Sequence, residues 1–178
     1  MSSMSNERIT PANNATITPD ALKLRQLREN IRSNQNLAMG IVAGAAAAIL
    51  GALTWGGLTF AIERQFGWMA IGVGLLVGFA VRRFGQGVDM VYGIVGAVLS
   101  LLGCVMGNLF TSCIVIADQE GVAISQAVAA LNPSVIGQIL TATFHPMDIL
   151  FYAIAVYEGY RFSFRQLSNE ELAALPAN

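Results

Sequence analysis

Long uncharged stretches alternate with short charged ones along this chain. The uncharged runs cover residues 33–62, 65–81 and 90–117, which are 30, 17 and 28 residues long. A helix that crosses a bilayer core of about 30 Å needs about 20 apolar residues, so the first and third runs are long enough. The second run also reaches across if the arginines at its two ends extend toward the lipid headgroups. The pattern predicts an all-α fold, a four-helix transmembrane bundle with spans at 37–62, 66–81, 88–117 and 147–162.

The segment 121–144, between the third and fourth spans, is uncharged but carries Gln126, Gln138 and a central Asn132-Pro133 pair. It fits a fifth span, a re-entrant hairpin or two helices lying on the outer surface. Asn132 is a good helix cap and Pro133 suits the first helical position, so the pair marks the end of one helix and the start of another. We therefore expect an outer-face helical hairpin here.

The distribution of basic residues argues against the fifth span and predicts the orientation. Cytoplasmic loops of membrane proteins carry an excess of Lys and Arg. With four spans, nine of the ten basic residues fall on one side and only Arg64 falls on the other, whereas a fifth span would move Arg161 and Arg165 across. We expect both termini in the cytoplasm, with nine basic residues on that side: Arg8, Lys23, Arg25, Arg28, Arg32, Arg82, Arg83, Arg161 and Arg165.

The chain before the first span divides into a tail and a basic helix. Residues 1–17 are polar and short of bulky apolar groups, which is typical of disorder. Residues 18–36 open with Thr18-Pro19, a good helix start, and set apolar residues among basic ones at helical spacing. This segment is either an amphipathic helix that adheres to anionic lipid or a solvated leader helix that carries orienting charge. The membrane-surface residues of this basic helix are Lys23, Arg25, Arg28 and Arg32. At the other end of the sequence, residues 166–178 are expected to form a cytoplasmic tail.

Small residues recur at spacings of three and four in each of the first three spans. Such spacing places them on one helix face, where a neighbouring backbone can come close. Gly74 and Gly78 form a GxxxG pair in the second span, and the third span carries a longer ridge. We expect helix packing at Gly40, Gly44, Gly74, Gly78, Gly93, Gly96, Ser100, Gly103 and Gly107.

Aromatic residues near the span ends are expected at the membrane interface. Trp55 and Phe60 lie toward the end of the first span, and Trp68 lies at the start of the second. Tryptophan is enriched at membrane–water interfaces. We therefore expect these side chains to anchor the ends of their helices.

Composition narrows the range of functions. Hydrophobic residues make up 54% of the 178 residues and charged residues only 12%, which argues against an ordinary soluble surface. A net charge of −1 offers no basic patch for nucleic acid. The two cysteines, Cys104 and Cys113, fall on opposite faces of one helix and cannot bridge each other there. The sequence contains no metal-ligand pattern and no phosphate-binding loop after a strand, so we expect no metal and no cofactor.

Glu158 is the strongest candidate among the ionisable groups. It lies in the last span near the cytoplasmic edge, at about the depth of Asp89 and the Arg82-Arg83 pair. It is either a carboxylate that handles protons or ions, or half of an interfacial ion pair that pins the last helix. We favour the ion pair, with Arg82, Arg83 or Arg161 as the partner.

Two further groups of polar residues lie toward the outer face. His145 and Asp148 are three residues apart, so a His–Asp couple is geometrically possible, although a lone histidine before a proline is more often a loop residue. Asn108, Thr111 and Ser112 cluster at the far end of the third span. They either bond to a neighbouring helix or form a functional polar lining.

Short segments of the chain resemble known membrane proteins. The Asn132-Pro133-Ser134 sequence resembles the Asn-Pro-Ala tip of aquaporin half-helices, which implies a pore loop; aquaporins have two such tips and six spans, whereas this chain has one tip and four spans. The runs GVGLLVGFAVR and DILFYAIAVYEGYR resemble segments of small bacterial inner-membrane proteins of unknown function. The second resemblance implies a prokaryotic inner membrane and no particular activity.

Abundant packing surface and the lack of convergent polar residues favour a non-enzymatic structural or accessory subunit of a membrane assembly. The alternative is a homo-oligomeric channel or small-solute transporter, with the polar residues of the third span and the Asn132 tip lining a path. A membrane enzyme that uses Glu158 or the His145–Asp148 couple ranks last. The expected partners are the lipid bilayer and other membrane proteins or further copies of the chain.

Overall fold

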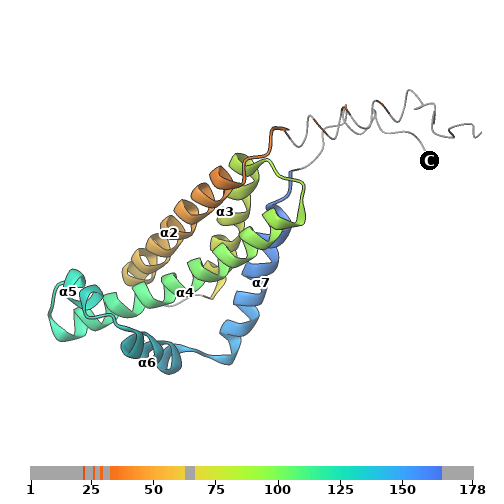
Figure 1. Ribbon diagram of the computed structural model, residues 1–178. Helices are drawn as coiled ribbons and strands as arrows, with labels where there is room; N and C mark the ends of the chain where they lie inside the picture. The colour runs from red at the N-terminus through yellow and green to blue at the C-terminus, as the bar shows by residue number, and fades with distance from the viewer. Residues whose placement is uncertain (1–21, 23–25, 27–28, 30–32, 63–66, 166–178) are drawn as a thin grey trace, which may run out of the picture. The chain divides into compact units, whose positions relative to one another are not determined.

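The computed structural model describes residues 22, 26, 29, 33–62 and 67–165, which form helices and loops with no strand. The all-α prediction is therefore confirmed for this part of the chain. The chain divides into two units, 1–30 with 167–178 and 31–166, and the second unit holds every helix labelled in Figure 1. Several predictions lie outside the described residues: the tails 1–17 and 166–178, and the basic residues Lys23, Arg25, Arg28 and Arg32.

Long apolar helices dominate this unit. Three of them, α2 (Leu37–Ile62), α3 (Trp68–Gly85) and α4 (Met90–Glu120), are long and apolar enough to cross a membrane. α6 (Pro133–Thr143) and α7 (Pro146–Phe162) are long and apolar enough only as a pair, and the chain bends by 107° between them. The described residues thus supply three possible spans, or four if the bent pair counts as one, and such helices are typical of a membrane protein. The helices are α2 (Leu37–Ile62), α3 (Trp68–Gly85), α4 (Met90–Glu120), α5 (Ile124–Ala129), α6 (Pro133–Thr143) and α7 (Pro146–Phe162).

α4 is the central helix of the unit and contacts every other helix in it. α3 packs against α4, and α2 and α7 each contact both members of this central pair from different sides (Figure 1). At 1.5 Å per residue the 31 residues of α4 extend about 46 Å, and the 17 residues of α7 extend about 25 Å. α4 therefore exceeds a bilayer core of about 30 Å. The short helices α5 and α6 pack on its C-terminal part.

The end of α3 differs from the sequence expectation. The second span was expected to end at Val81, but α3 continues through the paired arginines to Gly85. Gln86 then caps the helix in the left-handed conformation, at φ 50°, and its amide donates to the carbonyl of Arg82 at 3.1 Å. Cations are favourable in the last turn of a helix because they face its negative end. The arginines therefore extend the helix where the apolar pattern alone would have ended it.

Glycines allow the backbones of neighbouring helices to touch. A Cβ atom placed on Gly74 of α3 would lie 2.5 Å from the carbonyl oxygen of Ala155 on α7. On α4, a Cβ at Gly103 would lie 2.8 Å from Val73. The remaining residues expected to pack between helices are all buried: Gly40, Gly44, Gly78, Gly93, Gly96, Ser100 and Gly107.

Trp55 is a core residue, and its expected place at the membrane interface was wrong. The side chain is only 3% exposed, and its ring lies 2.7 Å from the position that a Cβ on Gly107 would take. The missing side chain of Gly107 on α4 provides the space that this ring fills. Phe60 and Trp68, in contrast, are 56% and 72% exposed.

Candidate functional site

One end of the unit, where α2 begins and α3 ends, is closed around the ring of Tyr92. The amide of Asn36 donates to the carbonyl of Gly85 at 2.9 Å, and the amide of Arg165 donates to the carbonyl of Gly87 at 2.9 Å. Tyr92 is 4% exposed, and a Cβ on either glycine would collide with its ring. These contacts join α2, α3, α4 and the residues after α7.

This end also carries the arginines of the described residues, and we call it the arginine end. Glu158 is half-buried on α7, and its Oε2 atom has no hydrogen-bond partner among the described residues. Arg161, one of its expected partners, donates instead to the hydroxyl of Tyr157 at 3.3 Å and lies 5.9 Å from the centre of that ring. Asp89 is exposed at the N-cap of α4. The arginines are Arg82, Arg83, Arg161 and Arg165.

The backbones of α4 and α7 meet beside two buried serines. Ser100 on α4 and Ser163, the residue that follows the last residue of α7, are both 0% exposed. Gly159 lies between them, because the Ser163 hydroxyl donates to its carbonyl at 2.5 Å and a Cβ on it would collide with Ser100. A Cβ on Gly96 would in turn collide with the carbonyl of Gly159. The two helix backbones therefore touch directly at this level.

Polar contacts link the same helices farther from the arginine end. The hydroxyl of Tyr152 on α7 donates to the carbonyl of Cys104 on α4 at 3.4 Å and also hydrogen-bonds with the side chain of Asn108. The thiol of Cys104 lies 3.8 Å from the carbonyl of Ala70 on α3. Asn108 is 2% exposed. This contact is of the kind expected if Asn108 bonds to a neighbouring helix.

The opposite end of the unit carries α5 and α6, and we call it the hairpin end. A groove of about 280 Å³ lies there between α4 and α6, and we call it the α4–α6 groove. Three of the residues that line it carry hydroxyl groups. Those of Ser112 and Thr143 donate to the carbonyls of Asn108 at 2.9 Å and of Ile139 at 2.8 Å. Thr111 is only 4% exposed, and its hydroxyl has no partner among the described residues. The groove is lined by Thr111, Ser112, Val115, Ile116, Ile139, Ala142 and Thr143.

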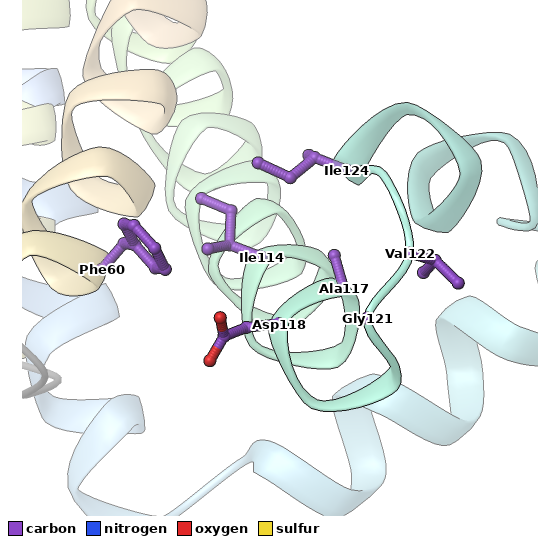
Figure 2. Close-up of a pocket in the computed structure, with 7 residues that line it drawn as sticks. All are labelled: Phe60, Ile114, Ala117, Asp118, Gly121, Val122 and Ile124. Carbon is purple, nitrogen blue, oxygen red and sulfur yellow. The ribbon is translucent and has the colours of Figure 1, made fainter.

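A second groove, of about 270 Å³, lies at the same end between α2, α4 and the start of α5. Figure 2 shows Phe60 extending from α2 toward the part of α4 that carries Ile114 and Asp118, with Ile124 of α5 beyond them. Asp118 is the only charged residue that lines this groove, and it is exposed. The groove therefore combines apolar walls with one carboxylate at an open edge.

The polar residues around α6 serve as helix caps. The side chain of Asn132 accepts a hydrogen bond from the amide of Val135 at 3.0 Å, so it caps α6 and is not among the residues that line the α4–α6 groove. The carboxylate of Asp148 accepts from the backbone amide of His145 at 2.8 Å, while the ring Nδ1 of His145 lies 2.9 Å from the carbonyl of Thr143. The His–Asp couple does not form, because the same spacing produces a capped helix start.

Within the described residues, no cluster of three or more His, Cys, Asp or Glu side chains could hold a metal ion. Comparison with protein-family models, with curated proteins and with solved structures finds no match to this chain. Inferences about its function therefore rest on the geometry described above.

Three residues that organise these contacts were not singled out from the sequence: Tyr92, Gly159 and Ser163. Gly159 on α7 and Ser163, which follows the last residue of α7, are four residues apart and face the small residues of α4. That spacing is the same signal that marked the ridge on α4. Tyr92 follows two glycines in a loop, a pattern that gives no sign of burial before the fold is known.

Proposed function

We propose that this chain is a non-catalytic integral membrane protein, a structural or accessory subunit of an assembly in the bacterial inner membrane. In this proposal α2, α3, α4 and α7 form a four-helix transmembrane bundle. α5 and α6 form a helical hairpin at the outer face, and both termini lie in the cytoplasm.

The observation that carries the proposal is the direct contact between helix backbones in the bundle interior. Gly74 meets Ala155 and Gly96 meets Gly159 without intervening side chains, and Val77 on α3 is 0% exposed. Close packing of this kind gives a rigid body and leaves little room for a path through a single copy. Large apolar side chains point outward instead, among them Val42 at 63% and Leu50 at 61% exposed. A rigid helical body with an apolar exterior suits a subunit that binds lipid and other membrane helices.

The charge distribution supports the proposed orientation. The arginine end carries the four arginines of the described residues, whereas the hairpin end carries the carboxylates of Asp118, Glu120 and Asp148. Because cytoplasmic segments are enriched in Lys and Arg, the arginine end is the better candidate for the cytoplasmic side.

The alternative functions receive less support from this geometry. A channel needs its polar lining to face an open path, but Asn108, Thr111 and Ser112 are at most 8% exposed and Asn132 caps a helix. An enzyme needs polar groups that converge on a substrate, and the side chains of His145 and Asp148 bond to nearby backbone instead.

The test is the native mass of the tagged full-length protein after gentle extraction from its own membrane, with the co-purifying chains identified. We expect a second membrane protein in fixed stoichiometry. An unrelated tagged membrane protein, extracted in the same way, controls for non-specific capture. A protein that stays strictly monomeric in every mild detergent and lipid would contradict the proposal. A homo-oligomer alone that conducts ions or solutes in liposomes would favour the channel.

A further inference from the structure

We propose that a groove at the arginine end binds an anionic phospholipid of the bilayer, with Arg83 donating hydrogen bonds to the lipid phosphate and Phe79 packing against an acyl chain. We call it the arginine groove. Its volume is about 370 Å³, and the described residues that line it are Phe79, Arg82 and Arg83 of α3. This inference rests on the proposed function only in requiring that the chain lie in a membrane. It depends neither on a protein partner nor on the proposed orientation.

The first step in the argument is the order of the lining residues along α3. Arg82 and Arg83 follow Phe79 by three and four residues, so all three lie toward one face of the helix. At 1.5 Å per residue, Phe79 lies about 6 Å nearer the middle of the helix than Arg83. The groove therefore presents an apolar surface toward the middle of the span and cationic groups toward its end. A ligand that matches it carries an apolar part and an anionic part in the same order.

The second step is the apolar wall. The ring of Phe79 packs against the ring of Phe162 on α7, with 5.2 Å between the ring centres. A Cβ on Gly78 would lie 2.9 Å from the Cβ of Phe162, so α3 and α7 are close together beside the groove. Phe79 nevertheless stays 49% exposed. The exposed part of its ring is a preformed apolar surface that an acyl chain can cover.

The third step is the charge of the groove. Arg83 is exposed, whereas Arg82 is half-buried and also interacts within the chain, so Arg83 is the principal donor. A guanidinium presents paired N–H donors that match two oxygens of a phosphate. The C-terminal end of α3 carries about half a negative charge, which the two guanidinium charges exceed. The lining residues that the structure describes include no carboxylate, so the ammonium group of a zwitterionic lipid would lack a partner there. The groove therefore favours a lipid with a net negative charge.

The fourth step is the source of the phosphate. The uncharged run 65–81 is followed directly by Arg82 and Arg83. Basic side chains at the end of an apolar span reach the headgroup region, and basic pockets there bind anionic headgroups. A free phosphate would contact the arginines and leave Phe79 uncovered. The apolar wall beside the arginines therefore identifies a bilayer lipid as the ligand.

The experiment compares Arg83→Gln with Arg161→Gln in the full-length protein. Both changes remove one positive charge from an exposed position at the arginine end, but Arg161 is not among the described residues that line the groove. Each variant is delipidated in mild detergent. It is then titrated with dioleoyl phosphatidylglycerol, which is anionic, and with dioleoyl phosphatidylcholine, which is zwitterionic and has the same chains. Binding is read by native mass spectrometry, and unchanged thermal unfolding shows that the variants are folded.

We expect the wild type to bind phosphatidylglycerol about fivefold more tightly than phosphatidylcholine, the factor for one basic residue near an anionic lipid. Arg83→Gln should weaken binding of phosphatidylglycerol about tenfold, the factor for a hydrogen bond to a charged group. Arg161→Gln should change it by less than about twofold, because an exposed charge outside the groove is screened. Equal losses in the two glutamine variants would overturn the site, and equal binding of both lipids by the wild type would overturn the preference for an anionic lipid.

Two further measurements test the contacts separately. Arg83→Lys keeps the charge without the paired donors and should lose part of the affinity for phosphatidylglycerol, even if the glutamine variant does not fold. Wild-type affinity in Arg83→Lys would overturn the paired contact with the phosphate. Glycerophosphoglycerol, the same headgroup without chains, should bind about a hundredfold more weakly than the lipid because it cannot cover Phe79. Binding as tight as that of the lipid would overturn the choice of source.

These outcomes are independent of the test of the proposed function. The titration uses the isolated chain, so the absence of a protein partner leaves its result unchanged. Conversely, a chain that co-purifies with a partner but does not distinguish the two lipids would refute only the lipid site in the arginine groove.

Discussion

Gly72 and Gly74 lie two residues apart on α3, and their surroundings differ. A Cβ on Gly74 would lie 2.5 Å from the carbonyl oxygen of Ala155, whereas a Cβ on Gly72 would meet nothing within 4 Å. We expect Gly74→Ala to lower the free energy of unfolding by about 2 kcal/mol, because α3 and α7 must separate. Gly72→Ala, the matched control, should leave it unchanged or raise it by up to about 1 kcal/mol. Denaturant titration of both variants in detergent, followed by circular dichroism, measures the difference. Equal stability of the two variants would contradict the close contact between α3 and α7.

Tyr92 offers a second test at the scale of single residues. Its ring is 4% exposed and fills the space above Gly85 and Gly87 at the arginine end. Tyr92→Ala should lower the free energy of unfolding by about 3–5 kcal/mol, because it leaves a cavity where several segments meet. Tyr157→Ala, at a side chain that is 55% exposed, should cost much less. The same denaturant titration compares them, and a similar loss in both variants would mean that Tyr92 does not hold this end together.

At the scale of elements, a helix cap lies at the bend between α6 and α7. The Asp148 carboxylate accepts from the His145 amide at 2.8 Å, where α7 begins. Asp148→Ala should therefore lower the free energy needed to open the first turn of α7 by about 1 kcal/mol. Amide exchange in that turn should then be about fivefold faster. Hydrogen exchange of a peptide that covers 143–150 measures this effect. Asp148→Asn keeps an acceptor oxygen and should change the exchange rate less. If alanine and asparagine variants exchange at the wild-type rate, the cap does not hold the bend.

The helices that the sequence predicted best are those whose limits follow from apolar runs. α2 covers Leu37–Ile62, the bounds of the first predicted span. α3 continued past the expected Val81 because arginines stabilise the last turn of a helix while they interrupt its apolar pattern. Hydropathy measures transfer to lipid and carries no information on the charge of the last helical turn. The limits of α2 were therefore predicted correctly, and the C-terminal limit of α3 was not.

The contacts between helices were harder to foresee, because each depends on two segments at once. The position of Trp55 near a span end is compatible with an interfacial anchor, and only the small Gly107 on α4 makes a core position available. The spacing of His145 and Asp148 fits a side-chain couple as well as a capped helix start, and the bend at this point favours the cap. One sequence constrains the faces of a helix, but not which neighbour each face meets.

At the scale of the whole unit, the two ends differ in packing as well as charge. At the arginine end, backbone hydrogen bonds and the buried ring of Tyr92 hold several segments together. At the hairpin end, α5 and α6 contain no buried residue. The α4–α6 groove and the groove lined by Asp118 lie at this second end. Binding surfaces are expected where packing is loose, since rearranging well-packed helices is costly. A protein partner that recognises this chain is therefore expected to contact the hairpin end.

The orientation of the two ends can be tested by cysteine labelling in intact bacterial cells. Cys104 and Cys113 are buried and are first replaced by alanine, which leaves a background without thiols. Single cysteines are then introduced by Val88→Cys at the arginine end, and by Gln119→Cys and Ser134→Cys at the hairpin end. All three positions are exposed.

We expect a membrane-impermeant maleimide to label the variants Gln119→Cys and Ser134→Cys in intact cells, because the end rich in arginine should face the cytoplasm. Val88→Cys should react only after the membrane is permeabilised. The reverse result would invert the proposed orientation while leaving the fold unchanged. Labelling at Gln119→Cys without labelling at Ser134→Cys would place α6 inside the membrane as a re-entrant segment. That outcome would exclude the outer-face hairpin, because the 107° bend would then reverse the chain within the bilayer instead of at its surface.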